Sequence, residues 1–101
     1  MKRSRIQVPK KVKIYRPARS NLFREDYAAI IRKNKALQER IDKKLLQILK
    51  NPEAYKPLKS PLQGYRRVQV GSFVITFRIQ GDLVRYVRIA HHDKIYSLFH
   101  D

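Results

Sequence analysis

The chain has no cysteine and no tryptophan, and it has only three glycines and one methionine among its 101 residues. The lack of cysteine excludes disulfides and thiolate zinc sites, which fits a reducing compartment. No apolar run approaches the roughly 20 residues of a membrane-spanning helix, and no hydrophobic signal core follows the N-terminal charges. We therefore expect a cytoplasmic protein without a membrane partner.

Acidic residues are also scarce. Eight Asp and Glu residues stand against 24 Lys and Arg residues, which gives a formal net charge of +16. Solubility does not require so one-sided a balance. The charge predicts a polyanionic or acidic partner, and contact with nucleic acid is the favoured interpretation.

The length and the apolar share, 43%, are those of one small folded domain. Residues 1–11 are basic and include Pro9, which predicts a flexible tail followed by a single domain over 12–101. The alternation of apolar and polar residues over 12–15 predicts a short first strand that ends before Pro17.

Helical spacing of apolar residues then predicts two helices. The first is capped at Ser20 or Asn21 and has Glu25 and Asp26 in its first turn, and Asn34 suits a left-handed turn out of it. The second helix ends at residues 51–52, Asn-Pro, because proline cannot continue a helix. The short connection predicts an antiparallel helix hairpin.

Three β runs follow at about 64–70, 73–80 and 83–90, separated by Gly71 and Gly81, which suit tight hairpins. The chain is thus predicted to be an α+β domain: a short N-terminal strand, an antiparallel helix hairpin and a three-stranded antiparallel meander. The helices should cover one sheet face and leave the other open.

Strand parity predicts which side chains reach the open face. The side chains expected to face the helices are Val68, Val70, Phe73, Ile75, Phe77, Leu83, Val87 and Ile89. Those expected on the open face are Tyr65, Arg67, Gln69, Val74, Thr76, Arg78, Tyr86 and Arg88. Cations interleaved with aromatic rings are typical of RNA binding, and an ordinary solvated sheet face is the alternative that parity alone leaves open.

The meander and the segment after it resemble the RelE/ParE toxin superfamily, whose members end in a pattern close to G-x-Y-R-v-R-v-G-d-y-R-v-i-y … v-g-H-R-x-x-v-Y. Here Gly64-Tyr-Arg-Arg-Val-Gln-Val-Gly matches its start, and His-His-Asp-Lys-Ile-Tyr, residues 91–96, matches its end. The similarity extends over about 12–97. It implies a RelE-like fold and a site on the open sheet face and the segment that follows it.

The resemblance assigns roles residue by residue. Arg67 and Gln69 stand where the family often has two cations, and Val74 stands where an arginine is usual. His92 occupies the arginine position of g-H-R, preceded by His91, and Tyr96 occupies the closing tyrosine. Gln69 and Val74 are departures that remove cations able to stabilise charge on a phosphate.

RNA can be cut by attack of its own 2′-hydroxyl on the neighbouring phosphate, so the protein has only to move protons and stabilise charge. His92 is the predicted general acid, Arg67 and Arg88 the predicted phosphate contacts, and Tyr96 the orienting or stacking residue. The predicted RNA-binding residues are Tyr65, Arg66, Gln69, Arg78, Tyr86, Lys59 and His91. For the general base the sequence offers His91, which should point away from His92 on an extended chain.

Adjacent strand histidines should diverge, so we expect no metal site among His91, His92, Asp93, His100 and Asp101, and no cofactor. The resemblance implies a toxin of a type II toxin–antitoxin pair that cuts mRNA on the ribosome without a metal. Its implied partners are mRNA, the ribosome and a RelB-like antitoxin whose acidic or amphipathic segment blocks the site, with Val74 as part of the seat. The alternatives are a ParE-like gyrase poison and a catalytically inactive RNA- or ribosome-binding protein.

Overall fold

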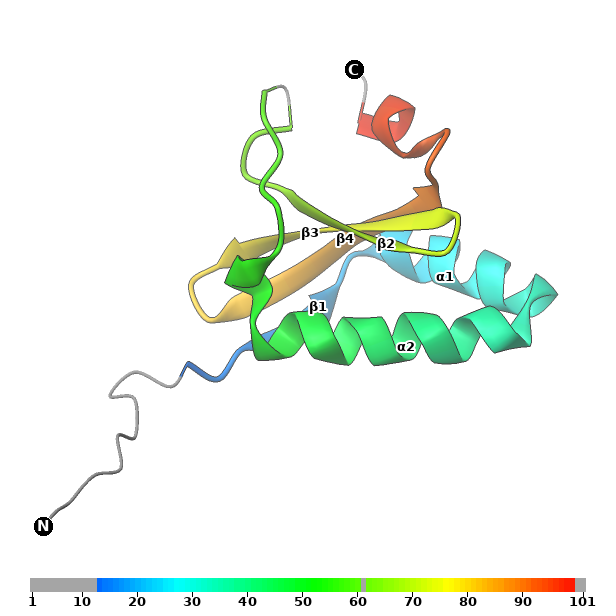
Figure 1. The fold of residues 1–101 in the computed structure, drawn as a ribbon, viewed down its shortest axis with the longest axis horizontal. Helices are drawn as coiled ribbons and strands as arrows, with labels where there is room; N and C mark the ends of the chain where they lie inside the picture. The colour runs from blue at the N-terminus through cyan, green and yellow to red at the C-terminus, as the bar shows by residue number, and fades with distance from the viewer. Residues whose placement is uncertain (1–12, 61, 100–101) are drawn as a thin grey trace, which may run out of the picture.

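The computed structural model describes residues 13–60 and 62–99, so the predicted tail over 1–11 lies outside the described residues. In chain order the elements are β1 (Arg16–Arg19), α1 (Asn21–Lys33), α2 (Lys35–Lys50), the 3-10 turn η2 (Pro52–Ala54), β2 (Arg66–Val70), β3 (Phe73–Gln80), β4 (Leu83–His91) and the 3-10 helix η3 (Ile95–Phe99). The strands form one four-stranded sheet in the order β1-β4-β3-β2. The predicted α+β class and the β2–β3–β4 meander are confirmed (Figure 1).

The first strand is four residues later than predicted. β1 pairs in parallel with the start of β4, from Arg16 opposite Leu83 to Arg19 opposite Tyr86, and residues 13–15 are not in a strand. Pro17, which was expected to end the strand, lies inside it. An edge strand tolerates proline because its missing N–H can face away from the sheet.

Both helices begin at a side-chain cap. The Phe23 N–H donates to Ser20 Oγ at 2.9 Å, and the Leu37 N–H donates to Asn34 Oδ1 at 3.1 Å. Asn34 has extended backbone, with φ of −150°, and ends α1 while it caps α2, so the predicted left-handed conformation is wrong. Glu25 and Asp26 are not in the first turn of α1 either. Asp26 lies one turn further on, where it contacts β4.

The two hairpin turns of the meander form as predicted. Gly71 and Gly81 have φ of +59° and +64°, and no other type of residue has a positive φ among the described residues. A positive φ at the first turn residue alone is the requirement of a type II′ hairpin, which glycine meets without strain. These turns fix the register of β2 and β4 on β3.

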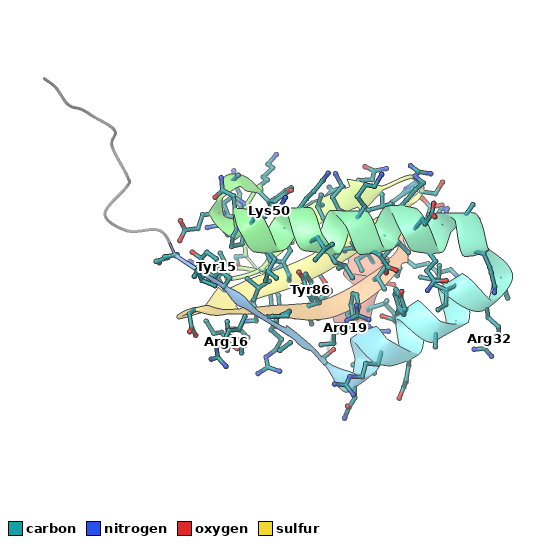
Figure 2. All side chains as sticks on the ribbon, turned by 90° about the horizontal axis from the view of Figure 1, so that it is seen from below. Tyr15, Arg16, Arg19, Arg32, Lys50 and Tyr86 are labelled. Atoms are coloured by element: carbon teal, nitrogen blue, oxygen red, sulfur yellow. The ribbon has the colours of Figure 1, made fainter. Side chains whose placement is uncertain are left out.

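The main core lies between the sheet and the two helices (Figure 2). Phe23 on α1, the stripe of Leu37, Ile41, Leu45 and Ile48 on α2, and Val70, Ile75 and Phe77 on the sheet are buried. The predicted helical stripes and the predicted parity of β2 and β3 are therefore confirmed.

The predicted parity of β4 is confirmed for Arg88 and Ile89 but wrong for the residues before them, because of a β-bulge. Thr76 pairs with Arg88, but the next pair is Phe77 with Tyr86, so Val87 is the extra residue. Before the bulge Val84 and Tyr86 face the helices, and after it Ile89 does. An extra residue reverses which side chains point to which face.

The second sheet face, here called the outer face, lies opposite α1 and α2. It is not open along its whole length, because the C-terminal segment with η3 passes over it (Figure 1). Val74, Thr76 and Ile95 are fully buried yet lie outside the main core. Within residues 13–60 and 62–99, no helix has the length and apolar character that crossing a membrane would require.

Candidate active site on the outer face

Two cation–aromatic pairs dominate the outer face. The Arg67 guanidinium lies 5.9 Å from the centre of the Tyr96 ring, and the Arg78 guanidinium lies 5.1 Å from that of Tyr65. The Tyr65 ring in turn packs against Phe99, with centroids 5.2 Å apart. Residues from β2, β3 and η3 thus form one surface that offers both charge for phosphates and rings for bases.

The charges of Arg67 and Arg78 are not neutralised by nearby acids. Among the described residues, the carboxylates within ion-pair distance of a lysine or arginine belong to Asp82, Glu53 and Asp26, and they bind other cations. The Arg78 Nε is also buried without a hydrogen-bond partner in the described part of the chain. Both guanidinium groups can therefore balance the charge of an anion on this face.

His92 lies in the turn that follows β4. Its backbone N–H donates to the Ser72 carbonyl at 2.8 Å, which fixes this turn against the β2–β3 hairpin. Its Nδ1 lies 3.0 Å from Asp93 Oδ1, and its side chain is 49% exposed. A carboxylate on Nδ1 keeps a proton on that nitrogen, so Nε2 is left to face solvent and a ligand.

His91 does not point away from His92 as an extended chain would require. The two rings stack with centroids 4.4 Å apart and planes at 29°, because the chain turns directly after His91. The other neighbour of His91 is Phe73, whose ring it meets edge to face at 5.9 Å. The two imidazoles and Asp93 are therefore one cluster, which parity along an extended strand did not predict.

Arg88, a predicted phosphate contact, is held by an acid instead. Its Nε and one terminal nitrogen donate to the two Asp26 oxygens at 2.9 and 3.0 Å, and both side chains are more than four-fifths buried. These hydrogen bonds, with the Asp26 charge, raise the pKa of Arg88 above its ordinary value. Asp26 also accepts the Ile89 N–H, so the pair attaches α1 to the free edge of β4. Arg88 has a structural partner that sequence analysis missed.

Tyr86 was expected on the outer face and is 2% exposed on the helix side, because of the bulge at Val87. Its hydroxyl donates to the Leu45 carbonyl at 2.6 Å, and burial raises its pKa to about 12. Its predicted role in RNA binding is therefore wrong. Figure 2, seen from the helix side, shows Tyr86 in the gap between α1 and α2.

Of the other predicted RNA-binding residues, Arg66 is held by the loop after α2, whereas Gln69 and Lys59 are exposed. Arg66 donates to the carbonyls of Glu53 and Tyr55, so it stabilises the loop after α2 rather than joining Arg67. Gln69 is exposed and bonds the Gly71 carbonyl. Lys59 is exposed in the loop that leads to Tyr65.

Val74 lies on the predicted face but is fully buried, so it cannot belong to an exposed binding seat. The sequence analysis did not predict that the C-terminal segment covers this part of the sheet. The apolar residues Ile95, Leu98 and Phe99 could have indicated that the segment packs against the sheet. Asp93 is the other functional candidate that sequence analysis left without a role.

A sheet with a helix hairpin on one face and a basic, partly covered outer face is the architecture of a known class of small toxins. Residues 18–96 match the family model described as the ParE toxin of the type II toxin–antitoxin system parDE. The chain is 37% identical over 69 residues to a Methanocaldococcus jannaschii protein named "Putative toxin RelE4", a match that covers 65% of this chain and 73% of that one. The chain belongs to the RelE/ParE toxin family of type II toxin–antitoxin systems.

Solved structures agree on the fold. The toxin–antitoxin complex RelBE2 from Mycobacterium tuberculosis matches with a TM-score of 0.67 and 18% identity, over 77% of this chain and 98% of that one. The chromosomal ParDE system from P. aeruginosa matches with a TM-score of 0.66 and 16% identity, over 77% and 96%. At these identities the likeness concerns the fold and does not distinguish RelE-type from ParE-type activity.

Proposed function

We propose that this toxin is an endoribonuclease that cuts mRNA on the ribosome without a metal ion, with His92 as its general acid. The observation that carries the proposal is the half-exposed His92 imidazole, bound through Nδ1 to Asp93 and followed four residues later by Tyr96, which packs against Arg67. The name of the M. jannaschii relative, a RelE toxin, favours the same activity.

The proposed reaction uses the RNA's own 2′-hydroxyl as the nucleophile. The 2′-oxygen forms a bond to phosphorus while solvent water takes its proton, and the bond from phosphorus to the 5′-oxygen breaks, which leaves a 2′,3′-cyclic phosphate on one fragment. Protonated His92 donates its Nε2 proton to that 5′-oxygen, while Asp93 holds the ring through Nδ1. Arg67 stabilises the charge on the phosphate, and Tyr96 stacks on a base or orients Arg67.

Primer extension on an mRNA translated in vitro, with and without the protein, tests the proposal. The wild type should cut within codons and leave 5′-hydroxyl ends, which accept a labelled phosphate without prior dephosphorylation. His92→Gln should cut about 10²–10⁴-fold more slowly, the usual contribution of general acid–base catalysis. Equal cutting by His92→Gln, or fragments with 5′-phosphate ends, would contradict this mechanism.

Gyrase poisoning is the second candidate, and two observations favour it. Gln69 and the buried Val74 stand where nuclease relatives often carry cations, and the matching family model is that of ParE. Inhibition of gyrase supercoiling by purified protein that leaves translated mRNA intact would establish this candidate. RNA binding with neither activity would establish an inactive RNA-binding protein instead.

The expected partner is an antitoxin, and we propose that an acidic, amphipathic segment of it occupies the groove between residues 13–15 and α2. Ile14 and Leu46 are 79% and 63% exposed there. With Tyr15 and Leu49 they line a groove of about 450 Å³ that Lys13 and Lys50 flank. Figure 2 shows Tyr15 and Lys50 at the same end of α2. Apolar anchors between cations match an amphipathic helix with acidic flanks.

Substitution of one exposed leucine tests whether this groove binds the antitoxin. Leu46→Glu should weaken binding of the protein encoded by the neighbouring gene, because it places a negative charge in the groove. Leu22→Glu makes the same change at a 49% exposed leucine at the start of α1, outside the groove, and should bind normally. Equal affinity of the two variants in calorimetric titration would place the antitoxin elsewhere.

A further inference from the structure

The Asp93 carboxylate lies between two imidazoles at the end of β4. Its Oδ2 is 3.5 Å from His91 Nδ1, and its Oδ1 is 3.0 Å from His92 Nδ1. One donor atom from each of the three residues can be chosen so that all lie within 4.8 Å of one another. The divergence of adjacent strand histidines, which argued against a metal site, does not apply because the chain turns here.

We propose that His91, His92 and Asp93 form a binding site for a divalent transition-metal ion, and that Zn²⁺ is the ion whose chemistry fits. Zinc bonds of about 2.0–2.2 Å to nitrogen and oxygen in a tetrahedral arrangement place donors roughly 3.4 Å apart. The two nitrogen–oxygen distances, 3.0 and 3.5 Å, are already close to that value. Imidazole nitrogens favour zinc over magnesium, which prefers oxygen ligands.

The three side chains can reach an ion with little movement. They are 40%, 49% and 71% exposed, in the order His91, His92, Asp93, so the core need not change. His91 Nδ1 accepts a hydrogen bond from the Asp93 N–H at 3.2 Å. That nitrogen is therefore unprotonated, the form that binds a metal, and an ion would replace the Asp93 N–H on its lone pair. At His92 an ion would replace the Nδ1 proton that contacts Asp93. Water would complete the coordination sphere, as it does in open zinc sites.

The site has a consequence for activity, and this part rests on the proposed nuclease function. Zinc on His92 Nδ1 would displace the contact through which Asp93 holds the ring in the proposed reaction. Zn²⁺ should therefore inhibit the toxin, although the cut itself uses no metal.

Calorimetric titration of the untagged full chain with ZnCl₂ tests binding directly. One equivalent of Zn²⁺ should bind, and MgCl₂ should not. His91→Gln, His92→Gln and Asp93→Asn should each weaken binding at least about tenfold, because even residues that only support metal ligands typically contribute about 10–100-fold. Asp82→Asn, at another exposed aspartate, is the matched control and should bind as wild type does. Circular dichroism without zinc checks that each variant folds.

Absence of zinc binding, or equal binding by the wild type and both histidine variants, would overturn the site whatever the protein's activity is. Inhibition is measured separately, as the ratio of mRNA cutting with and without Zn²⁺. That ratio should fall for the wild type and stay near one for the residual cutting by His91→Gln. Binding at the three residues without any nuclease activity would overturn the proposed function but leave the metal site standing.

Discussion

The two faces of the sheet are built in different ways. On the helix side, large apolar side chains from all the long elements form one buried core, and its polar members, such as the Tyr86 hydroxyl, have partners. On the outer face Val74 and Thr76 from β3 and Ile95 from the short C-terminal segment are fully buried, and Arg67 and Arg78 lack acidic partners in the described part of the chain. The helix side supplies stability, and the outer face keeps its charges available to bind an anion.

The largest expected effect comes from the helix-side core. Phe77 is fully buried between β2, β4 and the loop after α2, so Phe77→Ala should lower the free energy of unfolding by about 3–5 kcal/mol. That is a large part of the roughly 5–15 kcal/mol that stabilises a typical domain. Phe99→Ala removes the same side chain from the outer face, where it is half-buried, and should cost clearly less in urea denaturation. If the two variants lost equal free energy of unfolding, the two faces of the sheet would contribute equally to stability.

Alkaline pH should weaken the same core through Tyr86. Burial raises the pKa of this hydroxyl to about 12 in the folded protein, against an ordinary value of 10.0. Between pH 10 and pH 12 the unfolded chain therefore loses this proton while the folded protein keeps it, and stability falls as pH rises. The loss should reach roughly 2–3 kcal/mol near pH 12, because each pH unit between the two pKa values corresponds to about 1.4 kcal/mol.

Urea denaturation at several pH values above 9 measures this dependence. Tyr86→Phe is the matched variant, because it keeps the ring and removes the ionisable hydroxyl with its bond to Leu45. It should be about 1 kcal/mol less stable than the wild type at pH 7, and its stability should decline less steeply above pH 10. Parallel curves for the two proteins would show that Tyr86 ionises as easily in the folded protein as in the unfolded chain.

On the outer face, Ile95 should contribute less than the helix-side core does. Its side chain is fully buried although it lies in the last described segment. Ile95→Ala should cost about 2 kcal/mol, the lower end of the range for such changes, because the short segment that carries this side chain can partly collapse into the space. Leu98→Ala, at a 39% exposed position, should cost less. A loss as large as that of Phe77→Ala would contradict the comparison.

The helix-side core could be predicted from the sequence because each of its signals is local. The α2 stripe from Leu37 to Ile48 follows helical spacing, and Ile75 and Phe77 alternate along an unbroken strand. The glycine turns at Gly71 and Gly81 need only a positive φ, which the sequence signals directly. Local periodicity and turn chemistry are sufficient for such elements.

The side-chain positions around the candidate site could not be predicted, because they depend on features that no short stretch of sequence indicates. One bulge residue, Val87, reversed the parity of β4 and moved Tyr86 into the core. The partner of Arg88 is Asp26, 62 residues earlier in the chain. The turn after His91 brought two histidines together that an extended strand would separate. Parity counting assumes regular strands and ignores distant partners, so these errors fell on β4 and the turn after it, and they affected both faces of the sheet.

The smallest expected effect on stability, and the sharpest test of the outer face, concerns Arg67. Its side chain packs on Tyr96 and has no acidic partner among the described residues, so Arg67→Gln should change the free energy of unfolding by about 0.5 kcal/mol or less. Its effect should appear in RNA binding instead. Loss of one phosphate contact should reduce the slope of log affinity for short single-stranded RNA against log salt by about 0.7.

Arg32→Gln is the control for that measurement. Arg32 is exposed at the end of α1, away from the outer face, and its loss changes the net charge by the same amount (Figure 2). If RNA lies on the outer face, fluorescence anisotropy titrations at several salt concentrations should show the reduced slope for Arg67→Gln and an unchanged slope for Arg32→Gln. Equal slopes for the two variants would mean that the overall charge, rather than this face, binds the RNA. The free guanidinium groups of the outer face would then be a solvated surface, and the functional site would have to be sought among the cations of the helices.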